Sequence, residues 1–321
     1  MKNFFSARST ADDVLSGTDL TGRRYFITGV SSGIGLETAR SLIAHGATVV
    51  GSVRNIAKAE AATKAFETAA MICGGKFELV ELDLSSLMNI KKCADSLLKT
   101  ANPFDGIIAN AGVMATPFAK TIDGFEMQFG VNYIGHFALV NMMTPLLINN
   151  GRVIVLSSQA HRVSDIDLSD PNFDDQEYDP FVAYGRSKTA TTLFAKELDQ
   201  RYRAQGIRAA SVMPGNSLTE LPRNFSEEDL RNLLETVEKA RAEAGLPPGE
   251  LKEVSQAAAT SVWALVLANM DEIGGHYLED CAVSSMNSAP NPFVDGVMPY
   301  ALDSDSARNL WDWTISRISN I

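Results

Sequence analysis

The stretch that decides the fold is Arg24-Tyr-Phe-Ile-Thr-Gly29-Val-Ser-Ser-Gly33-Ile-Gly35. Its first five residues form a short apolar run that predicts a buried strand, and the glycines predict a tight turn into a helix. Gly29 and Gly33 can adopt backbone angles that other residues avoid, and Gly35 lets the helix pack closely on the sheet. Such a turn points the N-terminus of a helix at a phosphate group, so the stretch indicates a nucleotide-binding unit.

Apolar runs alternate with helical patterns along the rest of the chain. We expect strands near 24–28, 47–53, 77–82, 104–109, 151–157 and 207–212, with helices in the intervals. Alternation of this kind builds a parallel sheet, and right-handed crossovers place helices on both of its faces. The expected fold is a single Rossmann-type, doubly wound α/β sheet that binds ligands beyond the carboxyl ends of its strands.

Size and charge limit the classes of protein. The 321 residues, 45% of them hydrophobic, suffice for one large domain. A net charge of -11 and a pI near 4.9 disfavour nucleic acid and anionic membranes, since both bind basic surfaces. No apolar run approaches a membrane span, and residues 1–22 lack a signal-peptide core, so we expect a cytosolic protein. The three scattered cysteines and four histidines predict neither disulfides nor a metal site.

The stretch Tyr184-Gly-Arg-Ser-Lys188 is the second informative one, because its phenol and ammonium lie one helical turn apart on the same face. A free tyrosine titrates near ~10, and a nearby ammonium favours the phenolate and lowers that pKa. We therefore expect Tyr184 to exchange protons near neutral pH. The pattern also arises by chance in many helices, so it carries weight only together with other motifs.

Several motifs in one order resemble the short-chain dehydrogenase/reductase family, from about residue 20 to about residue 281. The glycine spacing is G-x-x-x-G-x-G, not the G-x-G-x-x-G of the usual dinucleotide fingerprint. The segments 131–137, 157–161 and 183–188 are most similar to the retinol-dehydrogenase and WW-domain-oxidoreductase branch. The residues that carry the family resemblance are Thr28 to Gly35, Asp83-Leu84, Asn110-Ala111-Gly112, Asn132, Ser157-Ser158, Tyr184 with Lys188, and Pro214-Gly215 with Thr219.

The resemblance also implies how the chain is divided. Residues 1–22 form an N-terminal arm, 23–283 the NADP-binding catalytic domain of about seven strands, and 284–321 a tail that the resemblance does not explain. The stretch Gly274-Gly-His-Tyr-Leu278 resembles the family's last strand, and a lid over the substrate is expected at about 216–250. The segment 164–180 holds seven acids and no Lys or Arg, which favours a solvated loop.

The region after the second strand predicts the cofactor. Enzymes that use NAD usually place a carboxylate there, but residues 45–58 contain none, and Arg54 stands where the ribose should lie. A guanidinium can pair with a 2′-phosphate, so we expect NADP(H) rather than NAD(H), although Arg54 could simply open a turn. By resemblance, Asp83 binds the adenine amino group. The other implied cofactor contacts are Gly29, Ser31, Ser32, Gly33, Ile34, Gly35, Leu84, Asn110, Ala111, Gly112, Tyr184, Lys188, Pro214, Gly215 and Thr219.

Carbonyl reduction requires a proton donor, because negative charge grows on the oxygen as hydride reaches the carbon. We expect Tyr184 to be the acid and base, Ser158 to polarise the carbonyl, and Lys188 to tune Tyr184 and hold the ribose. By resemblance, Asn132 holds a water that links Lys188 to solvent. Ser158 could instead only finish a strand, and Asn132 could be a buried structural residue. Candidates for the substrate pocket are Met114, Thr116, Phe181, Asn216 and Leu218.

The function predicted from these residues is reduction of a ketone or aldehyde, or the reverse oxidation of an alcohol. A non-catalytic NADPH sensor or scaffold of the same fold is the alternative from another class, and a sugar-nucleotide epimerase or dehydratase is a second enzymatic one. His136 is expected to be a hydrogen-bonded core residue and His161 to order the loop after Ser158. Family members often pair through the helices that hold Asn132 and Tyr184, so a homodimer is a further expectation, which the tail could block or extend.

Overall fold

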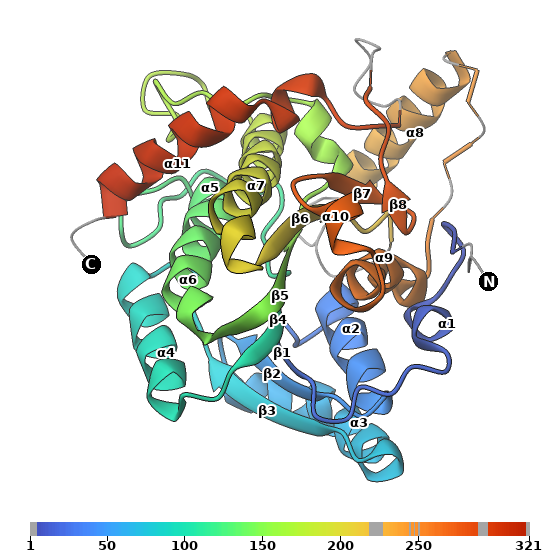
Figure 1. Cartoon of the computed structure of the whole chain (residues 1–321). Helices are drawn as coiled ribbons and strands as arrows, with labels where there is room; N and C mark the ends of the chain where they lie inside the picture. Colours follow the sequence, from blue (N-terminus) through green and yellow to red (C-terminus); the bar gives the residue numbers. More distant parts are fainter. Residues whose placement is uncertain are drawn as a thin grey trace.

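The fold is built on one eight-stranded sheet, shown by a computed structural model that describes residues 5–217, 227–243, 245–246, 248–249, 251–287 and 295–318 (Figure 1). The strand order is β3-β2-β1-β4-β5-β6-β7-β8, and only β8 runs antiparallel to its neighbour. The strands are β1 (Arg24–Thr28), β2 (Thr48–Val53), β3 (Lys76–Glu81), β4 (Phe104–Ala109), β5 (Leu147–Leu156), β6 (Arg208–Met213), β7 (Tyr277–Glu279) and β8 (Ala282–Val283).

The doubly wound parallel sheet predicted from the sequence is confirmed, but the sheet has eight strands rather than about seven. The extra strand, β8, contains only two residues, both exposed, so it leaves no apolar run in the sequence. Strand β5 also begins four residues earlier than expected. The start of β5 was missed because the polar Asn149-Asn150 pair is typical of a turn in sequence. In the structure Asn150 has a φ of 69°, in the left-handed region.

Consecutive strand residues face opposite layers of helices, as the two-residue period of a strand requires. Phe26 belongs to the core beneath α4, α6 and α7, whereas Ile27 belongs to the core beneath α2 and α9. Figure 1 shows these two helical layers on either side of the sheet. The helices are α1 (Ala11–Leu15), α2 (Gly33–Ala44), α3 (Ile56–Cys73), α4 (Leu87–Thr100), α5 (Met127–Phe129), α6 (Gly135–Met143), α7 (Pro180–Tyr202), α8 (Glu227–Glu243), α9 (Val254–Val266), α10 (Met270–Ile273) and α11 (Ser304–Ile318).

The two ends of the described chain pack onto this body. Helix α1 has the predicted capping box between Thr10 and Asp13, and it lies against α9. Helix α11 lies along α7 (Figure 1), where Leu310 and Trp311 enter the core. The Tyr133 hydroxyl and the Thr314 hydroxyl are 2.6 Å apart. The C-terminal helix therefore covers part of the layer that holds the catalytic candidates.

The direction of winding reverses between β1 and β4, which are neighbours in the sheet although β2 and β3 separate them in the chain. A reversal of this kind opens a crevice beyond the carboxyl ends of the strands, where ligands of such sheets bind. Of the helices in the described ranges, none is both long enough and apolar enough to cross a membrane.

Candidate active site

The glycine turn brings the backbone of β1 and α2 against the end of β4. Gly29 and Gly33 have φ values of 73° and 59°, the left-handed region that glycine enters at little cost. A Cβ on Gly29 would lie 2.9 Å from the Ala111 Cβ, and one on Gly35 would lie 2.3 Å from the Asn110 Nδ2. Larger residues at Gly29 or Gly35 would therefore push these segments apart.

Thr28 and Asn110 hold that turn in place. The Thr28 hydroxyl accepts hydrogen bonds from the backbone N–H groups of Asn110 (2.8 Å) and Ala111 (2.9 Å). The Asn110 amide donates to the Thr28 carbonyl at 2.8 Å and to the Gly29 carbonyl at 3.2 Å. The polar groups beside the crevice are thus fixed by one another before any ligand binds.

His136 is a buried structural residue within this network. Its Nδ1 lies 2.9 Å from the Asn132 carbonyl, and its Nε2 lies 2.9 Å from the Thr28 hydroxyl. A carbonyl can only accept, so the proton is assigned to Nδ1 and Thr28 donates to Nε2. Burial lowers the pKa of His136 to about 4, which keeps the ring neutral. His136 is therefore the hydrogen-bonded core residue that its apolar surroundings in the sequence predict.

The three catalytic candidates meet at the end of β5. Ser158 follows that strand and caps the 3₁₀ turn η3 (Gln159–Arg162), its hydroxyl accepting from the Ala160 N–H at 3.1 Å. Tyr184, on the second turn of α7, is 3% exposed and hydrogen-bonds to the Ser158 side chain. The Lys188 Nζ lies 5.6 Å from the centre of the Tyr184 ring and donates to the Leu156 carbonyl at 3.0 Å. The structure thus brings Ser158, Tyr184 and Lys188 together.

The protonation states differ from the sequence-based expectation. Burial raises the pKa of Tyr184 to about 12, and the hydrogen bond to Ser158 only partly offsets that rise. Burial also lowers the pKa of Lys188 to about 8. The prediction of a lowered tyrosine pKa is therefore wrong for this geometry, because desolvation of the phenol raises the pKa more than the hydrogen bond with Ser158 lowers it. Tyr184 is protonated at neutral pH, and Lys188 is close to its titration point.

Asn132 lies in a single π-helical turn, η1 (Gly130–Ile134), just before α6. Its side-chain amide donates to the Val113 carbonyl and the Ser187 hydroxyl, both at 2.9 Å, and accepts from the Val113 N–H at 2.8 Å. A Cβ on Gly112 would lie 3.1 Å from the Asn132 Oδ1 and 3.8 Å from the Lys188 Nζ. Asn132 therefore joins the segment after β4 to α7, beside Lys188.

The remaining cofactor candidates follow the ends of successive strands. Arg54 is exposed directly after β2. Asp83 follows β3, and its Oδ1 accepts from the backbone N–H (2.9 Å) and the hydroxyl (2.7 Å) of Ser85. Pro214 and Gly215 follow β6. Thr219, like the substrate candidate Leu218, lies outside the described residues.

The candidates nearest the glycine turn differ in exposure. Ser31 is exposed, whereas Ser32 and Ile34 are partly buried at the start of α2. Ser32 stands at the N-cap but makes no side-chain capping hydrogen bond, so its hydroxyl does not occupy the helix terminus. Leu84 is 7% exposed, and its carbonyl would be 2.5 Å from a Cβ on Gly135. The lack of a side chain at Gly135 therefore lets α6 approach Leu84 closely.

Four substrate candidates have described positions, and all four are partly buried. Phe181 precedes Tyr184 by three residues on α7, so the two side chains leave the same side of the helix. Thr116 is tied to the loop before α7, since its carbonyl accepts from the Tyr178 hydroxyl at 3.0 Å. The Asn216 carbonyl accepts from the Lys252 N–H at 2.7 Å. Met114 lies in the segment that joins Gly112 to Thr116.

The acidic segment 164–180 is anchored to α7 rather than freely solvated. Arg186, two residues after Tyr184, donates to the Asp170 carbonyl at 3.0 Å and to the Gln176 Oε1 at 2.9 Å. Its guanidinium carbon also lies 4.4 Å from the centre of the Phe173 ring. The segment has no Lys or Arg of its own, and Arg186 of α7 supplies the positive charge.

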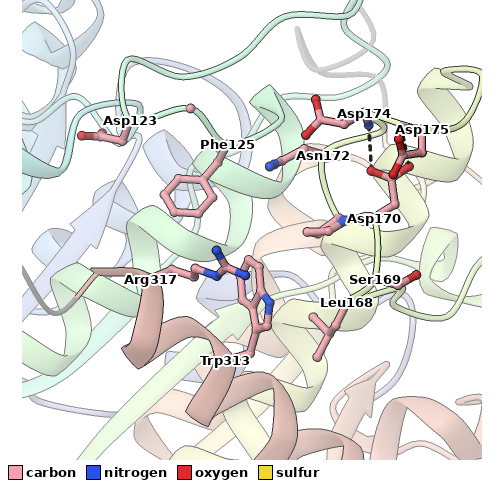
Figure 2. Close-up of a pocket in the computed structure, with 12 residues that line it drawn as sticks. Asp123, Phe125, Leu168, Ser169, Asp170, Asn172, Asp174, Asp175, Trp313 and Arg317 are labelled. Atoms are coloured by element: carbon pink, nitrogen blue, oxygen red, sulfur yellow. Dashed lines mark hydrogen bonds between the residues drawn. The ribbon is translucent and has the colours of Figure 1, made fainter.

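A cavity of about 400 Å³ lies between this acidic loop and the C-terminal helix, and Figure 2 shows the side chains that line it. Trp313 and Arg317 of α11 line one side, with the guanidinium carbon 5.3 Å from the Trp313 ring centre. Asp170 belongs to the wall formed by the acidic loop. The described catalytic candidates are absent from its lining, so this cavity is separate from the crevice beyond β5.

Comparisons with known proteins identify the family of this chain. A family model of the short chain dehydrogenases matches residues 23–230. The chain belongs to the short-chain dehydrogenase/reductase family. It is 34% identical over 323 residues to short-chain dehydrogenase/reductase prx1 of Penicillium roqueforti, covering 98% of this chain and 91% of that protein. Membership makes the protein an oxidoreductase of that family, and the family uses a nicotinamide cofactor.

Two further relatives bear on the branch and on the fold of this family member. It is 34% identical over 286 residues to the WW domain-containing oxidoreductase of Drosophila melanogaster, covering 86% of this chain and 66% of that protein. This match confirms the predicted similarity to the WW-domain-oxidoreductase branch. A crystal structure of an uncharacterised Mycobacterium paratuberculosis protein superposes with a TM-score of 0.72 at 30% identity, covering 97% of each chain.

Sequence reasoning missed the roles of two residues that organise the site. Thr28 was noted only as part of the motif that resembles the family, and its support of both Asn110 and His136 was not predicted. Ser187 lies inside the Tyr184–Lys188 stretch, yet its contact with Asn132 could not be read from spacing, because the two residues are 55 positions apart.

Proposed function

We propose that the protein is an NADP(H)-dependent oxidoreductase that interconverts an alcohol and a ketone or aldehyde, with Tyr184 as the general acid and base. The observation that carries this proposal is the buried hydrogen bond between Ser158 and Tyr184, with the Lys188 Nζ 5.6 Å from the phenol ring centre. A proton donor, a polarising hydroxyl and a cation thus converge where one strand ends. Carbonyl reduction needs a proton donor, and the hydroxyl and the cation stabilise the negative charge that grows on the oxygen.

The residues at the glycine turn fit a dinucleotide. Glycine at positions 29 and 35 lets the turn pack directly on Asn110 and Ala111, which fixes the N-terminus of α2 at the end of the sheet. Ser32 does not cap α2, which leaves the first-turn N–H groups of that helix facing the same place. A bound reduced nicotinamide would supply hydride to the carbonyl carbon. The glycine turn and the N-terminus of α2 would hold its pyrophosphate.

Side chains of the protein would stabilise and protonate the carbonyl oxygen of the substrate as negative charge grows on it. Ser158 would donate a hydrogen bond to the carbonyl oxygen, and Tyr184 would give that oxygen its proton as the C=O bond becomes C–O–H. The Lys188 ammonium would favour the phenolate that Tyr184 leaves behind. Because the raised pKa keeps Tyr184 protonated at neutral pH, the resting site is set for reduction rather than for oxidation.

Arg54 is proposed to select the cofactor. Replacing it with Ala should raise the dissociation constant for NADPH by about tenfold or more, since a charge-assisted pair with a phosphate contributes about 1.5–3 kcal/mol. NADH has no 2′-phosphate, so its affinity should stay within about twofold of the wild-type value. Fluorescence titration of each reduced nicotinamide measures both constants. Equal losses for the two cofactors would show that Arg54 does not bind the 2′-phosphate.

A panel of ketones and aldehydes, assayed with NADPH and with NADH, tests the proposed reaction. Oxidation of the reduced nicotinamide should depend on the carbonyl compound and should be faster with NADPH. Binding of NADPH without turnover of any panel member would instead indicate a sensor or scaffold.

Pairing of two copies stays a prediction, and α11 already covers part of α7, one of the helices through which pairing was expected.

A further inference from the structure

The C-terminal segment 295–302 packs against the turn that follows the catalytic Ser158. It lies between β8 and α11 (Figure 1). Val297 is 1% exposed, forms a short parallel bridge with Met286, and donates its N–H to the Ser285 carbonyl at 2.8 Å. Val297 and Ala301 share a small core with Tyr277 of β7. Contacts with residues 285–286 and with Tyr277 of β7 therefore fix this segment beside the site.

His161 connects this segment to Ser158 through the two nitrogens of its ring. Its Nδ1 lies 2.7 Å from the Ser158 carbonyl, and its Nε2 accepts from the Met298 N–H at 3.1 Å. A carbonyl only accepts and a backbone N–H only donates, so the neutral tautomer with a proton on Nδ1 is the one that satisfies both contacts. The ring is fully buried. His161 therefore joins two backbone groups that are 140 positions apart.

Two more contacts tie the same turn to the same segment. The Tyr300 hydroxyl donates to the His161 carbonyl at 2.7 Å. The neighbouring Arg162, 4% exposed, donates its Nε proton to the Gly296 carbonyl at 2.7 Å. Arg162 also pairs with Glu279 of β7 at 2.9 Å. The turn after Ser158 thus depends on the C-terminal segment for much of its hydrogen bonding.

The turn after Ser158 also sets the direction of the Ser158 hydroxyl. The Ser158 carbonyl accepts from both the N–H and the Nδ1 of His161, at 3.1 and 2.7 Å. The Ser158 hydroxyl accepts from the Ala160 N–H and also hydrogen-bonds to Tyr184. A rotation of this turn would therefore move the hydroxyl away from Tyr184.

We propose that His161 is a positioning residue that transmits the docking of segment 295–302 to Ser158, so that this segment completes the catalytic site. The proposal rests on the proposed carbonyl chemistry. It differs from the local role expected from the sequence, in which His161 only ordered the loop after Ser158. The C-terminal segment becomes part of the catalytic machinery, although none of its described residues needs to touch the substrate.

The test removes one backbone N–H. Met298 has a φ of -69° and lies next to extended backbone, so Met298→Pro fits the chain and deletes only the donor to His161 and the methionine side chain. Met298→Ala keeps the N–H and measures the cost of losing the side chain. The kcat of Met298→Pro should be roughly tenfold below that of Met298→Ala, since small displacements of catalytic groups slow reactions strongly.

A double-mutant cycle shows whether the effect passes through His161. His161→Asn keeps an amide near the Ser158 carbonyl but cannot reach the Met298 N–H. Each single variant should lose kcat, the double variant should lose no more than His161→Asn alone, and the dissociation constant for NADPH should stay unchanged throughout. Multiplied losses in the double variant, or a Met298→Pro variant as active as Met298→Ala, would overturn the proposal.

Hydrogen exchange separates this proposal from the proposed function. Met298→Pro should speed amide exchange within residues 158–163, relative to Met298→Ala, because the His161 ring loses one of its two anchors. Unchanged exchange there would overturn the coupling whatever the activity. If the wild-type protein turned over no carbonyl compound, the proposed function would fail, and the exchange data alone would still decide whether the segment orders the Ser158 turn.

Discussion

Tyr184→Phe is expected to lower kcat for carbonyl reduction by about 10³-fold, the scale of a lost general acid, while NADPH binding stays unchanged. Phenylalanine keeps the buried ring and removes only the hydroxyl that hydrogen-bonds to Ser158. The volume of the site is preserved, so the loss can be assigned to the proton. Steady-state kinetics and a fluorescence titration of NADPH measure the two quantities.

Tyr277→Phe is the matched control for this substitution. Tyr277 is also buried, at 1% exposed, and its hydroxyl has no hydrogen-bond partner within the described part of the chain. Removing that hydroxyl should leave kcat within about twofold of the wild-type value, because no bond is lost. A Tyr184→Phe variant that kept more than a tenth of the wild-type kcat would reject Tyr184 as the acid.

Lys188→Met should lower kcat by about 10²-fold and also change its pH dependence. The methionine keeps most of the volume but removes the charge that favours the Tyr184 phenolate. Burial lowers the pKa of Lys188 to about 8, so the ammonium is present below that pH and is lost above it. Wild-type reduction should therefore slow as the pH rises through about 8.

The pH profile of Lys188→Met tests the assignment directly, because this variant has no ammonium to lose. Its slow reduction should show no decline near pH 8, although a decline at higher pH from Tyr184 itself is still expected, since burial raises the pKa of that phenol to about 12. A decline near pH 8 that persisted in Lys188→Met would assign that titration to another group.

Local patterns in the sequence were enough to predict most of the sheet. Arg24–Thr28 and Phe104–Ala109 were predicted to the residue, because apolar runs ending at Gly or Asn mark buried strands clearly. The missed strand, Ala282–Val283, is short, exposed and held only by its pairing with β7. An element that depends on a partner strand carries little signal of its own.

The sequence predicted that Tyr184 and Lys188 lie together but not the electrostatics of the candidate site. The helical spacing of Tyr184 and Lys188 correctly placed them on one face, yet the spacing says nothing about how deeply the helix is buried. Desolvation is a property of the whole fold, and here it reverses the expected shift of the tyrosine pKa. The contact between His161 and Met298 was equally invisible, because nothing local in the sequence joins positions so far apart.

Transfer of deuterium to a carbonyl substrate tests the central claim most directly. The protein would be incubated with NADPH that carries deuterium at the transferable position, and with a panel of ketones and aldehydes, and the alcohols formed would be analysed by mass spectrometry. We expect an alcohol that carries one deuterium on the former carbonyl carbon, formed by the wild-type protein and by Tyr277→Phe but almost absent with Tyr184→Phe. Tight NADPH binding without any labelled alcohol, or equal labelling by Tyr184→Phe, would contradict it.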